Sequence, residues 1–151
     1  MGHSFCAHLK ANLTAGINAR LAPAFNLAGK VDNVLFLGKG GKRINDVERI
    51  DFHMIQSACP DIIILMIGDN GVFFDTDCEG LAGRLVSLAT MFCNRGLAQY
   101  MIITRLMPRF GIPHCLLDRI QGNTMREKKY RYLSMYSAKI DLINMELKHS
   151  T

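Results

Sequence analysis

The chain has 151 residues, a formal net charge of +5, and 49% hydrophobic against 21% charged residues. This length and composition predict a single globular domain over residues 1–151 and exclude an intrinsically disordered chain. The longest apolar run, Ile62–Ile67, is far shorter than the roughly 20 residues of a membrane-spanning helix, so a membrane partner is not expected.

The first part of the chain is predicted to contain helix, strand and helix in that order. The run Val34–Leu37 is apolar throughout, which is typical of a strand that is buried on both faces of a parallel sheet, and the glycine-rich loop Gly38–Gly41 follows it. Apolar residues recur at helical spacing before and after this run, at Phe5, Leu9, Leu13 and Ile17 and at Ile44, Val47, Ile50 and Met54. Pro60 is expected to end the second of these helices.

The second part repeats the alternation. Ile62–Ile67 predicts a strand that ends at Gly68, and Tyr100–Thr104 predicts another. Thr76 and Glu79 have the spacing of a capping box that would start the intervening helix. The apolar stripes of the two remaining helices are predicted at Leu81, Leu85, Leu88 and Phe92 and at Leu133, Tyr136, Ile140, Ile143 and Leu147.

Strands that alternate with helices predict an α/β fold with a parallel sheet. Ligands bind such sheets beyond the carboxyl ends of the strands, where the loops Gly38–Gly41 and Gly68–Gly71 are expected to be neighbours. Met1–Ser4 leads directly into the first predicted helix, so Ser4 is expected at the same edge.

Ser4, Gly41 and Asn70 are the candidate catalytic residues. A serine at the start of a helix can attack a carbonyl carbon, while backbone N–H groups and an asparagine amide stabilise the resulting oxyanion. Each residue also has a plain structural reading, with Ser4 as a helix cap and Gly41 and Asn70 as turn residues.

Three sequence blocks resemble those of the SGNH, or GDSL-type, hydrolases. Gly2-His3-Ser4-Phe5 resembles the first block, Gly41 (or alternatively Gly40) the second-block glycine, and Pro60–Gly71 the third block with its preceding strand. The resemblance implies a flavodoxin-like three-layer sandwich and a serine ester hydrolase that acts on small esters without cofactor or metal. It also implies oxyanion roles for the Ser4 N–H, the Gly41 N–H and the Asn70 side chain.

The sequence departs from this pattern. His3 and Gly71 stand where the family usually has Asp, and no Asp-x-x-His follows Asn70. No strand precedes Gly2, so the domain is expected to lack its first central strand and to be incomplete at both ends. His149 or His114 would have to replace the base, and little or no esterase activity is expected. The alternative is a non-catalytic binding or interaction domain that retains the fold.

Charge, cysteine spacing and the N-terminal sequence indicate which partners and which cellular location to expect. Charge alone motivates a third hypothesis, in which Lys39, Lys42, Arg43 and the run Arg126–Arg131 bind an anion or a nucleic acid. Such a run is usually a solvated helix start, so nucleic acid is not expected as a partner. The five widely spaced cysteines and the absence of a signal-peptide pattern predict reduced thiols and a cytoplasmic location.

Overall fold

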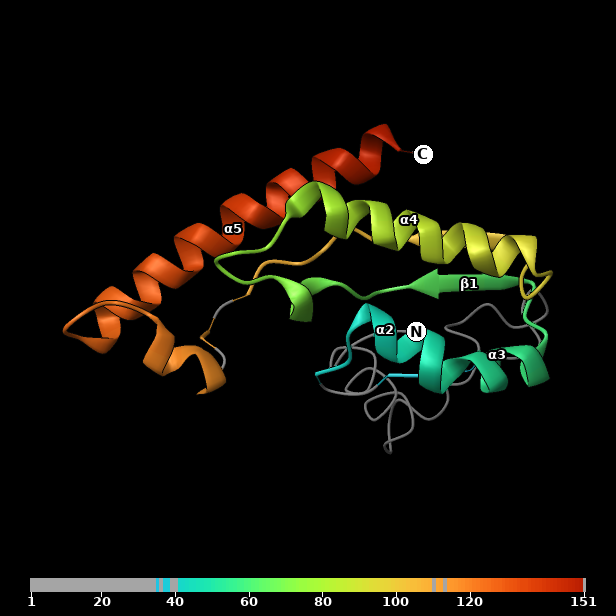
Figure 1. The fold of residues 1–151 in the computed structure, drawn as a ribbon, viewed down its shortest axis with the longest axis horizontal. Coiled ribbons are helices and arrows are strands. Elements are labelled where there is room, and N and C mark those ends of the chain that lie inside the picture. Colours follow the sequence, from blue (N-terminus) through green and yellow to red (C-terminus); the bar gives the residue numbers. More distant parts are fainter. Residues whose placement is uncertain (1–34, 36, 39–40, 110, 113, 151) are drawn as a thin grey trace, which may run out of the picture.

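The computed structural model describes residues 35, 37–38, 41–109, 111–112 and 114–150. Figure 1 colours its elements along the sequence. They are α2 (Ile44–Asp46), a π-helical turn (Val47–Asp51), α3 (Phe52–Ala58), β1 (Ile62–Leu65), a 3₁₀ turn (Asp69–Gly71), α4 (Cys78–Asn94), β2 (Tyr100–Ile103), a second 3₁₀ turn (His114–Arg119) and α5 (Met125–His149). The helix predicted over residues 5–17 lies outside the described residues.

The two strands form a parallel pair in which Ile62 lies opposite Tyr100 and Leu65 opposite Ile103. Helix α4 provides the crossover between them, which confirms the α/β class. The β1 side chains alternate, with Ile63 and Leu65 buried. The opposite face of the pair is open, since its four apolar side chains are each about half exposed or more: Ile62, Ile64, Tyr100 and Ile102. Within the described residues only one face of the pair is buried, and the flavodoxin-like three-layer sandwich stays a prediction.

The helix predicted after Gly41 is present, and it runs from Ile44 to Ala58 through the π-helical turn. Its predicted apolar stripe is partly wrong, because Ile50 and Met54 are about half exposed. The buried positions are Ile44, Val47, Asp51 and Ile55. Asp51 can be buried because it forms an ion pair with Lys42. Cys59, in a left-handed conformation, ends the helix just before Pro60, as predicted.

Helices α4 and α5 supply most of the core and pack against each other (Figure 1). Leu81, Leu85, Leu88 and Phe92 of α4 are all buried, which confirms their predicted stripe. The α5 stripe is confirmed from Tyr136 to Leu147, but it begins at the buried Tyr132 rather than at the half-buried Leu133.

The cap of α4 differs from the prediction. Asp77, and not Thr76, is the N-cap, and its carboxylate accepts a hydrogen bond from the Gly80 N–H at 3.0 Å. The Thr76 hydroxyl instead donates to the Gly71 carbonyl at 3.0 Å and accepts from the Phe73 N–H at 2.6 Å. Thr76 therefore closes the loop that leads into α4.

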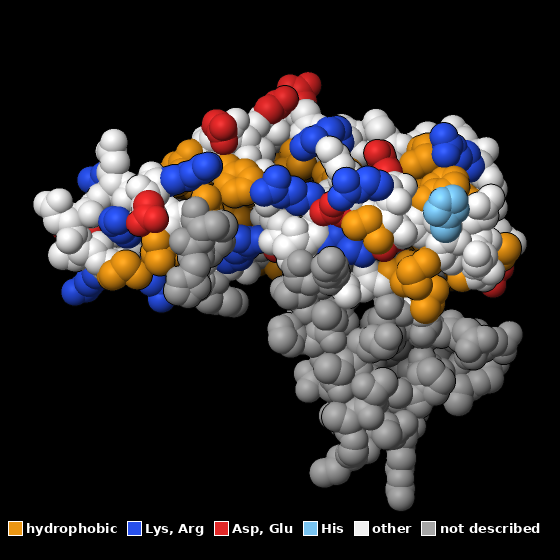
Figure 2. Space-filling model, turned by 60° about the horizontal axis from the view of Figure 1, so that its bottom comes forward, with side chains coloured by type: hydrophobic (Ala, Val, Ile, Leu, Met, Phe, Trp, Pro, Cys, Tyr) orange, Lys and Arg blue, Asp and Glu red, His pale blue; other side chains and the backbone are white. Residues whose placement is uncertain are grey.

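The surface carries charges of both signs. On the face in Figure 2, Lys and Arg side chains are spread along the length of the molecule, with acidic side chains and apolar groups between them. None of the described helices combines the length and the apolar character needed to cross a bilayer.

Candidate functional site

The loop after β1 is held in a tight conformation by its first glycine. Gly68 is buried and has φ 122°, a region that L side chains rarely adopt. A Cβ there would lie 3.2 Å from Leu85 Cδ1 and 3.4 Å from Leu106 Cδ2. The Gly71 N–H donates to the Gly68 carbonyl at 2.9 Å and closes the turn. This close packing fixes where Asp69 and Asn70 lie.

Both ends of the Asn70 amide are bonded. Its Nδ2 donates to the Lys42 carbonyl at 3.1 Å, and its Oδ1 accepts from Arg109 Nη2. The first bond ties the Gly68–Gly71 loop to Lys42, the residue after Gly41, so the end of the predicted glycine loop lies beside it. An amide nitrogen carries two hydrogens, so the bond to Lys42 uses one of them and leaves one for a ligand.

Arg109 joins this loop to α5. Its Nη2 lies 3.3 Å from Asp69 Oδ2, and its guanidinium lies over the Tyr136 ring at 5.3 Å from the ring centroid. Burial lowers the pKa of Arg109, but interactions with Tyr136, Asp69 and Tyr132 together outweigh that effect and leave the pKa raised. Arg109 is therefore a permanent cation that positions Asp69 and Asn70 together.

Tyr136 completes the support behind the loop. Its hydroxyl donates to the Met107 carbonyl at 3.3 Å, and its ring stacks on Tyr132 with 5.6 Å between centroids. Burial raises the pKa of the Tyr136 phenol, and this effect outweighs the opposite influence of the Arg109 charge. Neither Arg109 nor Tyr136 was among the site residues predicted from the sequence. The place of Arg109 in the loop after β2 could have indicated it, because that loop starts from the same edge of a parallel sheet.

Lys42 is not available to an external anion. Its Nζ contacts both carboxylate oxygens of Asp51, at 2.8 and 2.6 Å, and donates to the Leu37 carbonyl at 3.0 Å. Both side chains are almost completely shielded from solvent, at 4% and 3% exposure. Of the residues proposed to bind an anion at the glycine loop, Lys42 is therefore excluded, whereas Arg43 is exposed and stays a candidate.

Gly41 lies at the surface, next to Lys42, whose carbonyl bonds to Asn70 of the Gly68–Gly71 loop. It has φ 74°, and the space that a Cβ would occupy is open, so a ligand could approach its backbone. The structure thus brings Gly41 and Asn70 into neighbouring loops. Ser4 and the alternative glycine Gly40 lie outside the described residues, and so does Lys39.

The two histidines considered as bases lie on other parts of the fold. His149 is the last residue of α5, about 20 Å along the helix axis from Tyr136, which contacts Arg109. This end of α5 is therefore remote from the Arg109–Asp69 pair. His114 is the first residue of the 3₁₀ turn His114–Arg119, and its side chain is not described.

A pocket of about 180 Å³ opens beside the Gly68–Gly71 loop. Gly68, Gly71 and Phe73 line it from the loop, Arg43 from the start of α2, and Arg84 from α4. The Arg43 guanidinium lies 5.6 Å from the centroid of the Phe73 ring. The pocket therefore combines a cationic rim with the carboxyl end of β1.

In the part of the chain that the structure describes, no group of three or more His, Cys, Asp or Glu side chains is placed to hold a metal ion. No protein-family model, no curated protein and no solved structure matches the chain. The resemblance to the SGNH hydrolases therefore rests on the sequence blocks alone.

Proposed function

We propose that this chain is an ester-hydrolase domain of the SGNH type, with Ser4 as nucleophile and the Gly41 N–H and Asn70 Nδ2 as oxyanion donors. The observation that carries the proposal is the fixed Asn70 amide in the loop beside Gly41, at the carboxyl end of β1. A preorganised donor of this kind is what a developing oxyanion requires.

In the proposed reaction the Ser4 hydroxyl oxygen bonds to the ester carbonyl carbon and releases its proton to water. The carbonyl oxygen becomes the oxyanion that Gly41 and Asn70 stabilise. The bond from the carbonyl carbon to the alkoxy oxygen then breaks, the alkoxy oxygen takes a proton from water as the alcohol leaves, and a second water hydrolyses the acyl-serine. Lys42, Arg109 and Asp69 are positioning residues, since they bond to Asn70 or to one another.

Turnover is expected to be slow. No Asp-x-x-His follows Asn70 in this sequence, and loss of a catalytic base can cost up to about 10⁶ in rate. We expect the protein to hydrolyse a short-chain aryl ester at a rate close to that of spontaneous hydrolysis in buffer alone. Robust turnover that Ser4→Ala abolishes would contradict the expected inactivity, and equal robust turnover in both proteins would remove Ser4 from the mechanism.

A reaction that needs no turnover tests the nucleophile more directly. An aryl fluorophosphonate transfers its phosphonyl group to an activated serine with loss of fluoride, and peptide mass spectrometry locates the adduct. Without the Asp-x-x-His base the reaction should be slow, but the proposed oxyanion donors would still stabilise its transition state, so we expect a single adduct on Ser4 after prolonged incubation that is absent from Ser4→Ala. An unmodified Ser4 after prolonged incubation would contradict the proposal.

The second candidate function is a non-catalytic binding domain with the same fold. It is favoured by the engagement of both ends of Asn70 within the protein, which gives this residue a structural role of its own. The fluorophosphonate reaction separates the two candidates, because a binding domain has no reason to activate Ser4.

A further inference from the structure

The pocket beside the Gly68–Gly71 loop has an unbalanced charge. Two of the side chains that line it are the arginines Arg43 and Arg84, and both residues are exposed. Its other described lining residues are uncharged, so the pocket holds two positive charges and no carboxylate. An anion that enters it would meet guanidinium groups from two different elements, α2 and α4.

Two acidic residues close to these elements in sequence, Asp46 and Asp69, have other side-chain partners. Asp46 accepts from the Arg43 backbone N–H at 2.9 Å and lies 3.6 Å from Arg49. Asp69 pairs with Arg109 at 3.3 Å. Neither carboxylate forms an ion pair with Arg43 or Arg84.

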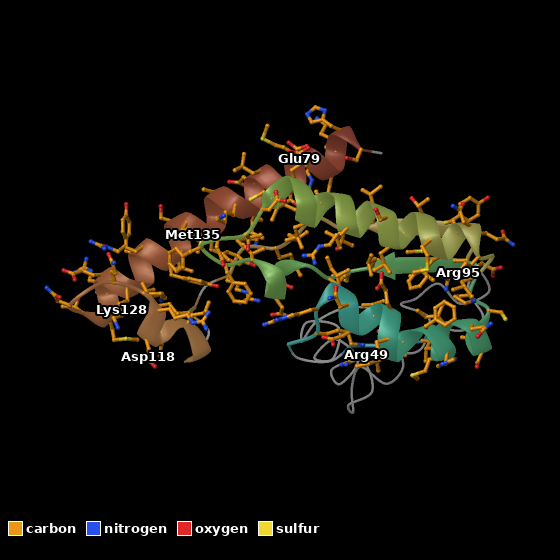
Figure 3. All side chains as sticks on the ribbon, in the orientation of Figure 1. Arg49, Glu79, Arg95, Asp118, Lys128 and Met135 are labelled. Atoms are coloured by element: carbon orange, nitrogen blue, oxygen red, sulfur yellow. The ribbon has the colours of Figure 1, made fainter. Side chains whose placement is uncertain are left out.

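Two arginines outside the pocket, Arg49 and Arg95, have partners within the protein. Arg49 pairs with Asp46 on the outer side of the helical run, and Arg95 lies over the Phe52 ring at 5.3 Å, at the opposite end of α4 from Glu79 (Figure 3). No ion pair with a described residue is formed by Arg43 or Arg84. The Arg43 guanidinium contacts the Phe73 ring by its face, and among the described residues it forms no ion pair, so the N–H groups at its edge can bind a ligand.

We propose that this pocket binds a phosphate group. Two guanidinium charges match the charge of about −1.5 to −2 that a phosphate monoester carries near pH 7, and each guanidinium can form two parallel hydrogen bonds to phosphate oxygens. The volume of about 180 Å³ suits a small anionic group rather than a long acyl chain. The pocket lies beside Asn70, so the substrate would be a small phosphorylated ester. That last step rests on the proposed function, whereas the phosphate site does not.

Inorganic phosphate is the probe, added to the full chain at low ionic strength and followed by calorimetry and by amide chemical shifts. We expect saturable binding at one site, with shift changes at Gly71, Phe73 and Arg84. Arg43→Gln and Arg84→Gln should each weaken the affinity by at least about tenfold, because each removes charge-assisted hydrogen bonds. Arg131→Gln, a change in the exposed basic run of α5, should leave it within about twofold.

A second ligand and two conservative variants test whether the site is specific for phosphate. Acetate should bind at least about tenfold more weakly than phosphate, because it carries one charge where the pocket offers two. Arg43→Lys and Arg84→Lys keep the charge but lose the paired hydrogen bonds, and both should also weaken phosphate binding.

Three results would overturn the phosphate site: no saturable binding, equal affinity for acetate, or affinity retained when both arginines are replaced. Phosphate binding with no Ser4 adduct would overturn the proposed function and leave the phosphate site standing. A Ser4 adduct without phosphate binding would do the reverse.

Discussion

Lys42 and Asp51 form an ion pair inside the protein, with 2.6 Å between Lys42 Nζ and Asp51 Oδ2 and with both side chains almost completely shielded from solvent. The pair links the residue after Gly41 to the helix that follows. The carbonyl of the same Lys42 accepts the hydrogen bond from Asn70. The position of the Asn70 amide therefore depends on Lys42, which the buried ion pair with Asp51 holds in place.

Lys42→Met should destabilise the protein strongly. The change leaves the Asp51 carboxylate buried without its cation, which typically costs about 3–5 kcal/mol. The double variant Lys42→Met/Asp51→Leu removes both charges and should recover most of this loss. Urea denaturation of the three proteins gives the free energies of unfolding. A loss below about 1 kcal/mol in Lys42→Met would show that the pair is not buried as described.

Gly68→Ala should also destabilise the protein, by about 1–3 kcal/mol. The new Cβ would be strained at φ 122° and would press on Leu85 and Leu106. Gly83→Ala is the matched control, because Gly83 lies within α4 with nothing within 4 Å of its Cβ position. That change should stabilise the protein by about 0.5–1 kcal/mol, since alanine favours a helix. Equal effects of the two changes in thermal unfolding would contradict the tight loop.

Tyr136 should make the protein less stable at high pH. Burial raises the pKa of its phenol above the ordinary value of 10.0, so the folded state keeps the proton after the unfolded chain has lost it. The contribution of Tyr136 to the free energy of unfolding is therefore complete below about pH 10 and decreases as the pH rises further.

Comparison with Tyr136→Phe isolates this effect, because phenylalanine keeps the ring and cannot ionise. We expect the free energy of unfolding to fall less steeply above about pH 10 in the variant than in the unchanged chain. Parallel curves would show that Tyr136 does not titrate abnormally. The variant also loses the hydrogen bond to the Met107 carbonyl, a constant offset of about 1 kcal/mol.

Among the described residues, the periodicity of apolar side chains predicted the helices well where the core is apolar. Leu81, Leu85, Leu88 and Phe92 lie as expected, because each buries a side chain at helical spacing along α4. The same reasoning failed at Ile50 and Met54. It counts apolar residues only, whereas this helix buries a carboxylate, Asp51, which a lysine outside the helix neutralises.

The candidate site was predictable in its location more than in its contacts. The Gly68–Gly71 loop follows an apolar strand, and the carboxyl ends of such strands carry ligand sites. The partners of Asn70 come from Lys42 and Arg109, positions 28 and 39 residues away in the sequence. No local pattern encodes contacts at such separations, since they follow from how the loops meet in space.

The role of Asn70 as an oxyanion donor is tested most directly by the rate at which the fluorophosphonate modifies Ser4. Removing one oxyanion donor typically costs about 10²–10³ in rate, so Asn70→Ala should slow the reaction by that factor. Asn94→Ala, at the exposed end of α4, should leave the rate unchanged. Arg109→Gln, which loosens the same loop but keeps the amide hydrogens of Asn70, should slow it much less. A rate in Asn70→Ala equal to that in Asn94→Ala would contradict the proposed role.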